Sequence, residues 1–395
     1  MRAILALEDG TVFEGEGFGA DRTVTGEICF NTSMTGYQEV LTDPSYRGQI
    51  ITMTYPQIGN YGINELDAES DQVHVRALVV EELSVVASNW RSEEDLDSYL
   101  KRWNVPGLQG VDTRALTKHL RLKGAMRACV MVGDEATAEA ALEMARNAQG
   151  VEGMDYVKEV TTSEAYEWDP DGTLSRQWTI VKGREEIREN VELGPNGQVF
   201  LPLPEAKYFI VAYDFGIKRN ILRRLRQHGF RVRVVPATTS AKEVLDMNPD
   251  GVFLGNGPGD PAALDYAHET ARELIGKKPL FGICLGQQIL GYAFGGKTFK
   301  MKFGHRGGNQ PVQEVATGKV SITAQNHGFA IDPATLPSEV TVTHINLNDQ
   351  TVAGIEHKEK KVFAVQYHPE AAPGPHDATD FFQQFANMID QNRKN

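Results

Sequence analysis

The chain has 395 residues, of which 41% are hydrophobic and 24% charged, and 40 Lys and Arg residues against 53 Asp and Glu residues give a formal net charge of −13. This length predicts two or three soluble domains, and the acidic balance argues against a broad surface for nucleic acid or for an anionic membrane. Three cysteines argue against a disulfide framework, and no apolar stretch approaches the roughly 18 residues of a membrane span. Because the first apolar run is also too short for a signal peptide, we expect a cytoplasmic protein.

Residues 1–150 are predicted to form a β-rich α+β domain. Asp9 and Gly10 stand between two short apolar runs, which is typical of a β-hairpin. Further strands are predicted at 26–30, 49–54, 73–80 and 128–132, and helices from Ser92, over 112–123 and over 135–147. The helices are inferred from capping residues, acidic first turns and glycines at the ends.

Residues 151–206 contain scattered charges, glycines and prolines without a periodic apolar pattern, which predicts a surface connector. From residue 207 to residue 395, predicted strands and helices alternate. The strands are expected at 208–213, 230–235, 250–254, 279–283 and from 362, and the helices at 218–228, 261–276 and 285–294. This alternation predicts a doubly wound α/β domain with a mostly parallel sheet, whose chemistry lies at the carboxyl ends of the strands.

Residues 282–286 have the pattern Gly-x-Cys-x-Gly, with an apolar strand before them and an apolar helix after them. This is the pattern of a nucleophile elbow, in which glycines permit a sharp turn that exposes the nucleophile above the sheet. The N-terminus of the following helix would stabilise a thiolate at Cys284. We therefore predict that Cys284 is a nucleophile, whereas Cys29 and Cys129, in mid-strand, are expected to be structural.

His368 and Glu370 follow the strand predicted from residue 362. Residues two apart on a strand point to the same side, so the Glu370 carboxylate could accept the Nδ1–H of His368 and leave Nε2 free as a base. Alone, this His-Pro-Glu segment indicates little more than a turn. Together with the elbow at Cys284, it predicts a Cys-His-Glu triad.

The glycine-rich segment 255–261 follows another predicted strand and exposes backbone N–H groups. We interpret it as part of an oxyanion hole, together with the N–H of Leu285. A phosphate-binding loop is the alternative, although Pro258 removes a donor and the Gly-x-Gly-x-x-Gly spacing is absent.

Residues 291–298 match the P-loop pattern letter for letter. A P-loop needs a strand before it and a helix after it, whereas here a helix is predicted to precede and a strand to follow. We therefore do not expect ATP to bind at this segment. The scattered histidines and cysteines show no metal-ligand spacing, so no metal site is predicted.

These segments, together with others along nearly the whole chain, resemble the small subunits of carbamoyl-phosphate synthases, a family of class I (triad) glutamine amidotransferases. All triad amidotransferases share the elbow and the His-Pro-Glu segment, whereas the N-terminal segments are specific to this family. The resemblance rests on residues 30–39, 41–46 and 54–60 in the N-terminal part and on 212–220, 255–261, 323–329 and 368–371 in the C-terminal part.

The resemblance implies an enzyme that hydrolyses glutamine to glutamate and ammonia, with Cys284 as nucleophile, His368 as base and Glu370 as the residue that orients the base. The implied ligands of L-glutamine are Ser45, Gly257, Gly259, Leu285, Gln288, Asn326, Gly328 and Phe329. Ammonia would pass to a large partner subunit that makes carbamoyl phosphate for arginine and pyrimidine synthesis. The resemblance places ATP and magnesium on that subunit and no cofactor in this chain, and it implies a heterodimer, with higher oligomers left open.

Gln287 stands where this family usually has a histidine, directly after the elbow. Because that histidine is not a triad member, we expect activity to persist.

Two other kinds of function are the alternatives to the one implied above. The N-terminal domain argues against a stand-alone cysteine hydrolase or the amidotransferase subunit of another synthetase, and the complete triad argues against a non-catalytic docking subunit.

Overall fold

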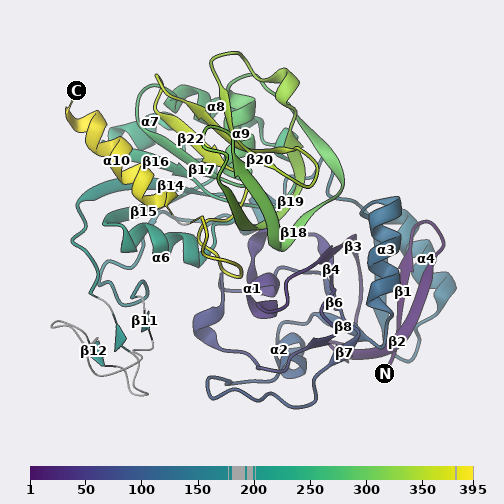
Figure 1. The fold of residues 1–395 in the computed structure, drawn as a ribbon. Helices are drawn as coiled ribbons and strands as arrows, with labels where there is room; N and C mark the ends of the chain where they lie inside the picture. Colours follow the sequence, from purple (N-terminus) through teal and green to yellow (C-terminus); the bar gives the residue numbers. More distant parts are fainter. Residues whose placement is uncertain (177, 180–191, 194–198, 201, 379, 395) are drawn as a thin grey trace.

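The computed structural model describes residues 1–176, 178–179, 192–193, 199–200, 202–378 and 380–394. A strand-rich N-terminal part (purple and blue) and a C-terminal α/β part (green and yellow) lie side by side in Figure 1. Segments 180–191 and 194–198 of the predicted connector lie outside the described residues. The described connector residues include α5 (Val157–Val160), β10 (Tyr166–Glu167) and the short paired strands β11 (Trp178–Thr179), β12 (Glu192–Leu193) and β13 (Val199–Phe200).

A closed barrel forms the centre of the N-terminal part, in the strand order β1-β2-β8-β6-β4-β3-β9. Its strands are β1 (Arg2–Leu7), β2 (Val12–Gly19), β3 (Thr23–Asn31), β4 (Gln49–Met53), β6 (Ala77–Val79), β8 (Pro106–Gln109) and β9 (Met126–Val132). The predicted hairpin at Asp9 and Gly10 joins β1 to β2. Closure of the barrel was not predicted, because it depends on β9 pairing with both β1 and β3, far away in the sequence.

A side chain caps the N-terminus of each helix beside the barrel except the first, which follows Gly36 without a side-chain cap. These helices are α1 (Tyr37–Thr42), α2 (Leu96–Arg102), α3 (Thr113–Lys123) and α4 (Ala138–Asn147). The helix predicted from Ser92 begins only after Asp95, because Asp95 is the residue that accepts the backbone N–H of Ser98. Likewise, α4 begins later than predicted, after its cap Thr137. Two short paired strands, β5 (Gln57–Ile58) and β7 (Glu82–Leu83), complete this part.

One sheet runs through the C-terminal part in the order β10-β15-β14-β16-β17-β22-β21-β20-β18-β19. Its strands after β10 are β14 (Tyr208–Asp214), β15 (Phe230–Pro236), β16 (Gly251–Leu254), β17 (Leu280–Ile283), β18 (Thr298–Glu314), β19 (Val320–Ile331), β20 (Thr341–Asn346), β21 (Val352–His357) and β22 (Val362–Val365). Neighbouring strands from β15 to β22 are parallel, as predicted. The strands from β21 to β19 extend this parallel centre with antiparallel pairs, and β10 pairs antiparallel with β15.

Helices cover both faces of this sheet, which confirms the predicted doubly wound α/β fold. They are α6 (Arg219–Gln227), α7 (Ala241–Asp246), α8 (Asp265–Leu274), α9 (Leu285–Ala293) and α10 (Phe381–Lys394). Ile221 of α6 and Phe385 of α10 belong to one buried core cluster. Leu274 of α8 and Ile289 of α9 belong to the other. Alternate residues of β14 contribute to the two clusters, as expected for a strand buried on both faces.

The long strands β18 and β19 extend from the sheet towards the barrel (Figure 1). The backbone N–H of Thr32 donates to the carbonyl oxygen of Arg306 on β18. The buried Glu27 of β3 also forms an ion pair with Lys300 of β18. The two parts of the chain are therefore joined along β18.

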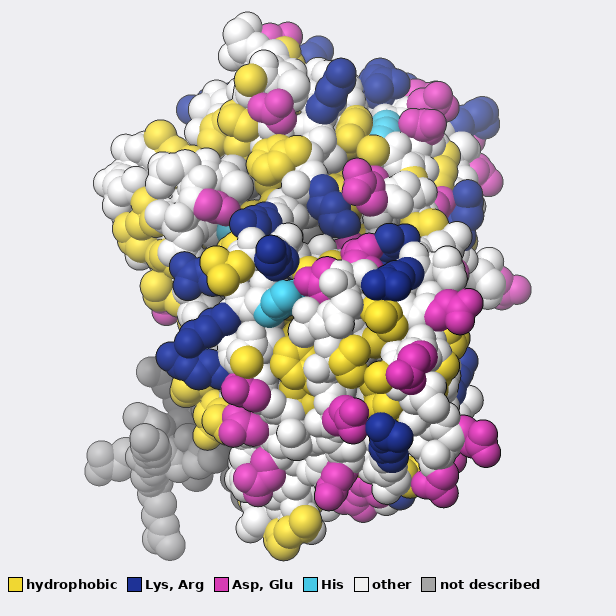
Figure 2. Space-filling model, turned by 90° about the vertical axis from the view of Figure 1, so that its right-hand side faces the viewer, with side chains coloured by type: hydrophobic (Ala, Val, Ile, Leu, Met, Phe, Trp, Pro, Cys, Tyr) yellow, Lys and Arg dark blue, Asp and Glu magenta, His cyan; other side chains and the backbone are white. Residues whose placement is uncertain are grey.

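Basic and acidic side chains are interspersed across the face shown in Figure 2. Such a mixture is expected from 40 basic and 53 acidic residues. Among the described residues, none of the helices combines the length and the apolarity needed to cross a bilayer.

Candidate active site

Cys284 stands at the turn between β17 and α9, as the elbow pattern predicts. Its backbone φ of 55° and ψ of −105° lie in a region that residues other than glycine rarely occupy. The flanking glycines permit this turn. A Cβ on Gly286 would lie 2.2 Å from the Leu254 carbonyl oxygen, and a Cβ on Gly282 would lie 2.8 Å from the carbonyl carbon of Gly286. The turn therefore places the buried Cys284 at the carboxyl end of β17 and the N-terminus of α9.

His368 and Glu370 contact each other, with 2.8 Å between His368 Nδ1 and Glu370 Oε1, and both residues are buried. The contact was expected, but the reason given for it is wrong, because β22 ends at Val365 and the two residues do not share a strand. Instead, the backbone N–H of His368 donates to the Ala324 carbonyl oxygen, and the chain then turns through residues 369–370. This turn brings the carboxylate to Nδ1.

A buried lysine that the sequence analysis did not assign extends these contacts. Lys218 Nζ lies 2.7 Å from Glu370 Oε1 and donates to the Ala372 carbonyl oxygen at 2.7 Å. Burial by itself would raise the pKa of Glu370, but the charges of Lys218 and His368 lower this pKa to about 2. Burial would lower the pKa of His368, but Glu370 raises it to about 10. The carboxylate is thus ionised, and the imidazole readily accepts a proton.

The Cys284 thiol and the His368 imidazole are neighbours in this buried site. The Sγ atom of Cys284 donates to the Asn326 carbonyl oxygen at 3.7 Å. Within the described residues, Nε2 of His368 is buried and has no hydrogen-bond partner. Cys284 is nevertheless close enough to be among the groups that raise the pKa of His368. Turning the thiol from Asn326 towards Nε2 would form the predicted contact between nucleophile and base.

A small cavity of about 30 Å³ lies beside Cys284. All predicted glutamine ligands except Leu285 line it, namely Ser45, Gly257, Gly259, Gln288, Asn326, Gly328 and Phe329. Leu285 follows Cys284 directly and is the first residue of α9. Further residues line the cavity that were not predicted as glutamine ligands from the sequence, namely Glu27, Gln49, Val151, Pro258, Arg306 and His327. These residues come from separate segments, so only the folded chain shows that they belong together.

Both parts of the chain contribute to this cavity. Ser45, from the barrel part, accepts a hydrogen bond from Asn256 Nδ2 at 2.9 Å. Asn326 Nδ2, on β19, donates to Asp43 Oδ2 of the barrel part at 3.0 Å. The cavity therefore lies at the boundary between the two parts.

Gln287, the departure from the family pattern, is fully buried in α9. Its Nε2 and that of Gln288 both donate to Gln366 Oε1, at 3.5 Å and 3.0 Å. Within the described part of the chain, Oε1 of Gln287 has no partner. Gln287 is not among the residues that line the cavity, so its effect on activity stays a prediction.

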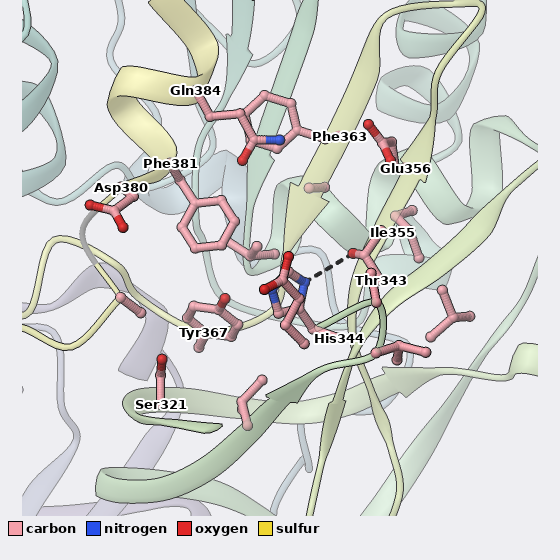
Figure 3. A pocket seen from close by; sticks show the side chains of 18 of the residues that line it. Ser321, Thr343, His344, Ile355, Glu356, Phe363, Tyr367, Asp380, Phe381 and Gln384 are labelled. Carbon is pink, nitrogen blue, oxygen red and sulfur yellow. Dashed lines mark hydrogen bonds between the residues drawn. The ribbon is translucent and has the colours of Figure 1, made fainter. Parts of the chain in front are cut away.

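The P-loop match at residues 291–298 and a second, larger cavity lie apart from this site. Gly291 of the P-loop match lies inside α9 and Thr298 begins β18, so a helix precedes the segment and a strand follows it. A larger cavity of about 520 Å³ lies between β18, β20–β22 and the start of α10, and Phe363, Tyr367 and Phe381 line it (Figure 3). It contains none of the predicted site residues. The chemistry is therefore assigned to the smaller cavity, beside the buried thiol and imidazole.

This fold and this site define a class I glutamine amidotransferase, and residues 211–388 match the family model for "Glutamine amidotransferase class-I". Residues 5–130 match "Carbamoyl-phosphate synthase small chain, CPSase domain". Three proteins named carbamoyl phosphate synthase small chain are similar to this chain over nearly its whole length. The one from Akkermansia muciniphila is 57% identical over 389 residues, covering 98% of each chain. Those from Syntrophotalea carbinolica and Escherichia coli (strain K12) are each 53% identical, over 394 residues (100% of this chain, 99% of the relative) and 393 residues (99% and 98%).

The chain belongs to the family of carbamoyl phosphate synthase small chains. The resemblance, the enzyme class and the fold class that were predicted from the sequence are thereby confirmed.

We expect Gly286→Ala to lower both stability and glutamine hydrolysis, because the added methyl group would press against the Leu254 carbonyl oxygen. Overpacking of this kind costs about 1–3 kcal/mol, and the displaced turn would move the sulfur of Cys284. Gly150→Ala is a matched control, since a Cβ there would meet only the Glu27 carboxylate, at 3.6 Å. Urea denaturation and a glutaminase assay measure the two effects. Equal midpoints and rates for both variants would contradict this steric explanation.

Proposed function

We propose that this chain is the glutaminase subunit of a carbamoyl phosphate synthase, hydrolysing glutamine to glutamate and ammonia for use by a large subunit. The observation that carries this proposal is the buried series Lys218, Glu370 and His368 beside Cys284, at a cavity between the two parts of the chain. A stand-alone hydrolase would need only the C-terminal part, whereas residues 5–130 match the small-chain model.

In the proposed reaction, His368 takes the thiol proton of Cys284, and the sulfur attacks the side-chain amide carbon of glutamine. A C–S bond forms, and backbone N–H groups of segment 255–261 and of Leu285 stabilise the negative oxygen. The protonated His368 then gives its proton to the leaving nitrogen, so that the C–N bond breaks and ammonia departs. Water, activated by His368, attacks the thioester, glutamate is released, and the proton returns to the sulfur.

The remaining ligands of glutamine are proposed to be the cavity residues predicted above, with Ser45 supplied by the barrel part. This reaction uses only protein groups and water, so we place ATP and magnesium on the large subunit. We also propose a heterodimer with that subunit, in the cytoplasm. The cysteines support a reducing compartment, because Cys29, Cys129 and Cys284, all within the described residues, form no disulfide.

An isotope experiment tests this function. Glutamine with ¹⁵N in its side-chain amide, supplied with ATP, bicarbonate and both subunits, should yield glutamate and ¹⁵N-containing carbamoyl phosphate. The chain without its partner should release glutamate more slowly. No glutamate from either preparation would overturn the glutaminase activity, and failure of the two chains to copurify would overturn the subunit role.

A further inference from the structure

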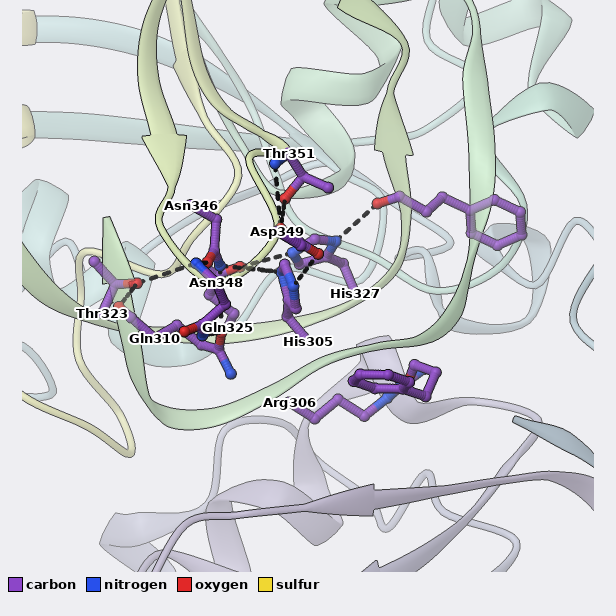
Figure 4. A network of polar contacts seen from close by, with 12 residues as sticks. His305, Arg306, Gln310, Thr323, Gln325, His327, Asn346, Asn348, Asp349 and Thr351 are labelled. Atoms are coloured by element: carbon purple, nitrogen blue, oxygen red, sulfur yellow. Dashed lines mark hydrogen bonds and ion pairs between the residues drawn. The ribbon is translucent and has the colours of Figure 1, made fainter. Parts of the chain in front are cut away.

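A chain of polar contacts connects the turn between β20 and β21 with the cavity beside Cys284 (Figure 4). It begins in that turn at Asp349, whose side chain is 39% exposed. Asp349 Oδ2 lies 2.9 Å from His305 Nε2, and His305 Nδ1 lies 3.1 Å from Gln325 Oε1. Gln325 Oε1 in turn lies 2.8 Å from His327 Nε2. Both histidines are buried, and the proposed function has not used them.

The inner end of this chain is the carbonyl group of Phe329. Its oxygen lies 2.7 Å from His327 Nδ1 and accepts a hydrogen bond from Gln288 Nε2 at 2.8 Å. Because a carbonyl oxygen only accepts, Nδ1 of His327 must carry a hydrogen. His327, Gln288 and Phe329 all line the cavity that contains Cys284. The position of the His327 hydrogen therefore affects the carbonyl that holds Gln288, a predicted ligand of glutamine.

The hydrogen of His305 is fixed by a second backbone group. The N–H of Asn348 donates to Asn346 Oδ1 at 2.9 Å, which turns the amide nitrogen of Asn346 towards His305. This Nδ2 lies 3.2 Å from His305 Nδ1, to which it donates. The hydrogen of a neutral His305 is therefore on Nε2, where the Asp349 carboxylate accepts it.

The side-chain oxygen of Gln325 stands between the two rings and can only accept. His305 with its hydrogen on Nε2, and His327 with its hydrogen on Nδ1, both direct a bare nitrogen at this oxygen. Two arrangements remove the conflict. Either both rings take a second proton, or the Gln325 amide rotates by half a turn and its NH₂ group donates to both rings. The oxygen of the rotated amide would then face the Thr323 hydroxyl, which lies 3.1 Å from the amide nitrogen and can donate to it.

Burial and charge decide between these two arrangements. Burial and the charges of His305 and other neighbours lower the pKa of His327 well below its ordinary value. The two ring centres are 5.0 Å apart, so two charged rings would repel each other. Among the described residues, the titratable or charged groups around the two rings are Asp349, Arg306, His368 and, on the cavity side of His327, Cys284 and Glu27. The Glu27 carboxylate already pairs with Lys300. Two neutral rings with the rotated amide are therefore favoured near neutral pH.

We propose that Asp349 and His305 are positioning residues for the proposed reaction, although neither lines the cavity. Asp349 keeps the hydrogen of His305 on Nε2, so that Nδ1 needs a donor from Gln325. The amide rotated in this way also donates to His327 Nε2, which keeps the hydrogen of His327 on Nδ1. That hydrogen holds the Phe329 carbonyl and the wall of the cavity. This inference rests on the proposed glutaminase function.

Asp349→Asn tests the chain of contacts with little change in shape. Asp349 Oδ1 accepts from the backbone N–H and the hydroxyl of Thr351, at 3.2 Å and 2.8 Å. The asparagine oxygen should stay there, so that its NH₂ group donates to His305 Nε2 and moves the hydrogen of His305 to Nδ1. ¹⁵N NMR of the imidazoles in the labelled full chain, near neutral pH, distinguishes a nitrogen that carries hydrogen from a bare one. The signals are assigned by their loss in His305→Gln and His327→Gln.

The same substitution should change glutamine binding more than the chemical step. In the complex with the large subunit, Asp349→Asn is expected to raise KM for glutamine about 10-fold or more, because a small displacement of the cavity wall is costly. The kcat should change by less than about threefold, since the triad is intact. The increase in KM should shrink as the pH falls from about 8 to about 6, because a doubly protonated His327 again carries hydrogen on Nδ1.

Asp332→Asn is the matched control. Its carboxylate also lies in a turn, where Oδ1 accepts the backbone N–H of Ala334 at 3.0 Å, and the change should leave KM within about twofold of the unaltered value. If the unaltered complex hydrolyses no glutamine, the proposed function fails. If it does, the positioning role is overturned by unchanged His305 signals in Asp349→Asn, or by a KM increase that is equal at both pH values. The NMR measurement needs only the full chain, so it decides even where the variant does not assemble.

Discussion

Replacing Cys284 by alanine is expected to lower glutamine hydrolysis by on the order of 10⁴-fold or more, as for other enzymes that lose their nucleophile. Without the sulfur no thioester forms, and His368 has no thiol to deprotonate. Synthesis from added ammonia should continue, because the proposed ATP chemistry belongs to the large subunit. A coupled assay for carbamoyl phosphate, run once with glutamine and once with ammonia, measures both quantities.

Cys129→Ala is the matched control for this substitution. Cys129 is also fully buried, but it lies on β9 of the barrel, and burial raises the pKa of its thiol to about 11. We expect normal glutamine use from this variant. Persistent glutamine use in Cys284→Ala would show that another residue is the nucleophile.

Glu370→Gln is expected to lower the free energy of unfolding by about 3–5 kcal/mol, the usual cost of removing one member of a buried ion pair. It removes the ion-pair partner of the Lys218 ammonium, whose side chain is 3% exposed. The same change removes the carboxylate that orients His368 Nδ1, so glutamine hydrolysis should also decrease. Urea denaturation and the glutaminase assay measure these two effects.

A second substitution distinguishes the buried charge from a general loss of packing. The double variant Glu370→Gln/Lys218→Met should regain much of the lost stability without regaining activity, because the buried ammonium that lost its ion-pair partner is gone. Lys242→Met is an exposed control, since the Lys242 side chain in its pair with Asp246 is 83% exposed, and it should change stability by less than about 0.5 kcal/mol. If the double variant is less stable than Glu370→Gln, the charge account is wrong.

The pair also predicts a pH dependence. The pKa of Glu370 is lower in the folded chain than its ordinary value of 4.5, so its contribution to stability is complete above this value and is lost as the pH falls towards about 2. The stability difference between the unaltered protein and Glu370→Gln should therefore shrink from about pH 6 to about pH 3. A difference that stays constant over this range would contradict the lowered pKa.

The parts of the fold that are predictable from the sequence are those with short-range signals. The alternation after residue 207 predicted the parallel strands, and two glycines around Cys284 predicted its turn, because few other residues allow this backbone. The pairing of His368 with Glu370 was expected from their spacing, but a turn produces it and not a continuous strand. The contact between His368 and Glu370 was thus predicted correctly, although the local structure assumed for it was wrong.

The features that were missed depend on contacts between distant segments. Lys218 stands just before α6, in a position where a lysine is ordinarily exposed, and only the folded chain places its Nζ against Glu370. In the sequence, Arg306 looks like any other arginine on a strand, and only the folded chain shows that it contacts Gln49 of the barrel. Closure of the barrel likewise requires the pairing of β9 with β1 and β3. No local pattern of residue types records these contacts.

The hydrogen bonds from Asn256 to Ser45 and from Asn326 to Asp43 have a mechanical consequence. Each couples a wall of the cavity in one half of the molecule to a short segment of the other half. A small rigid rotation of the barrel would therefore displace both walls of the cavity together. The geometry of the pocket beside the sulfur thus depends on how the barrel is seated against the other half.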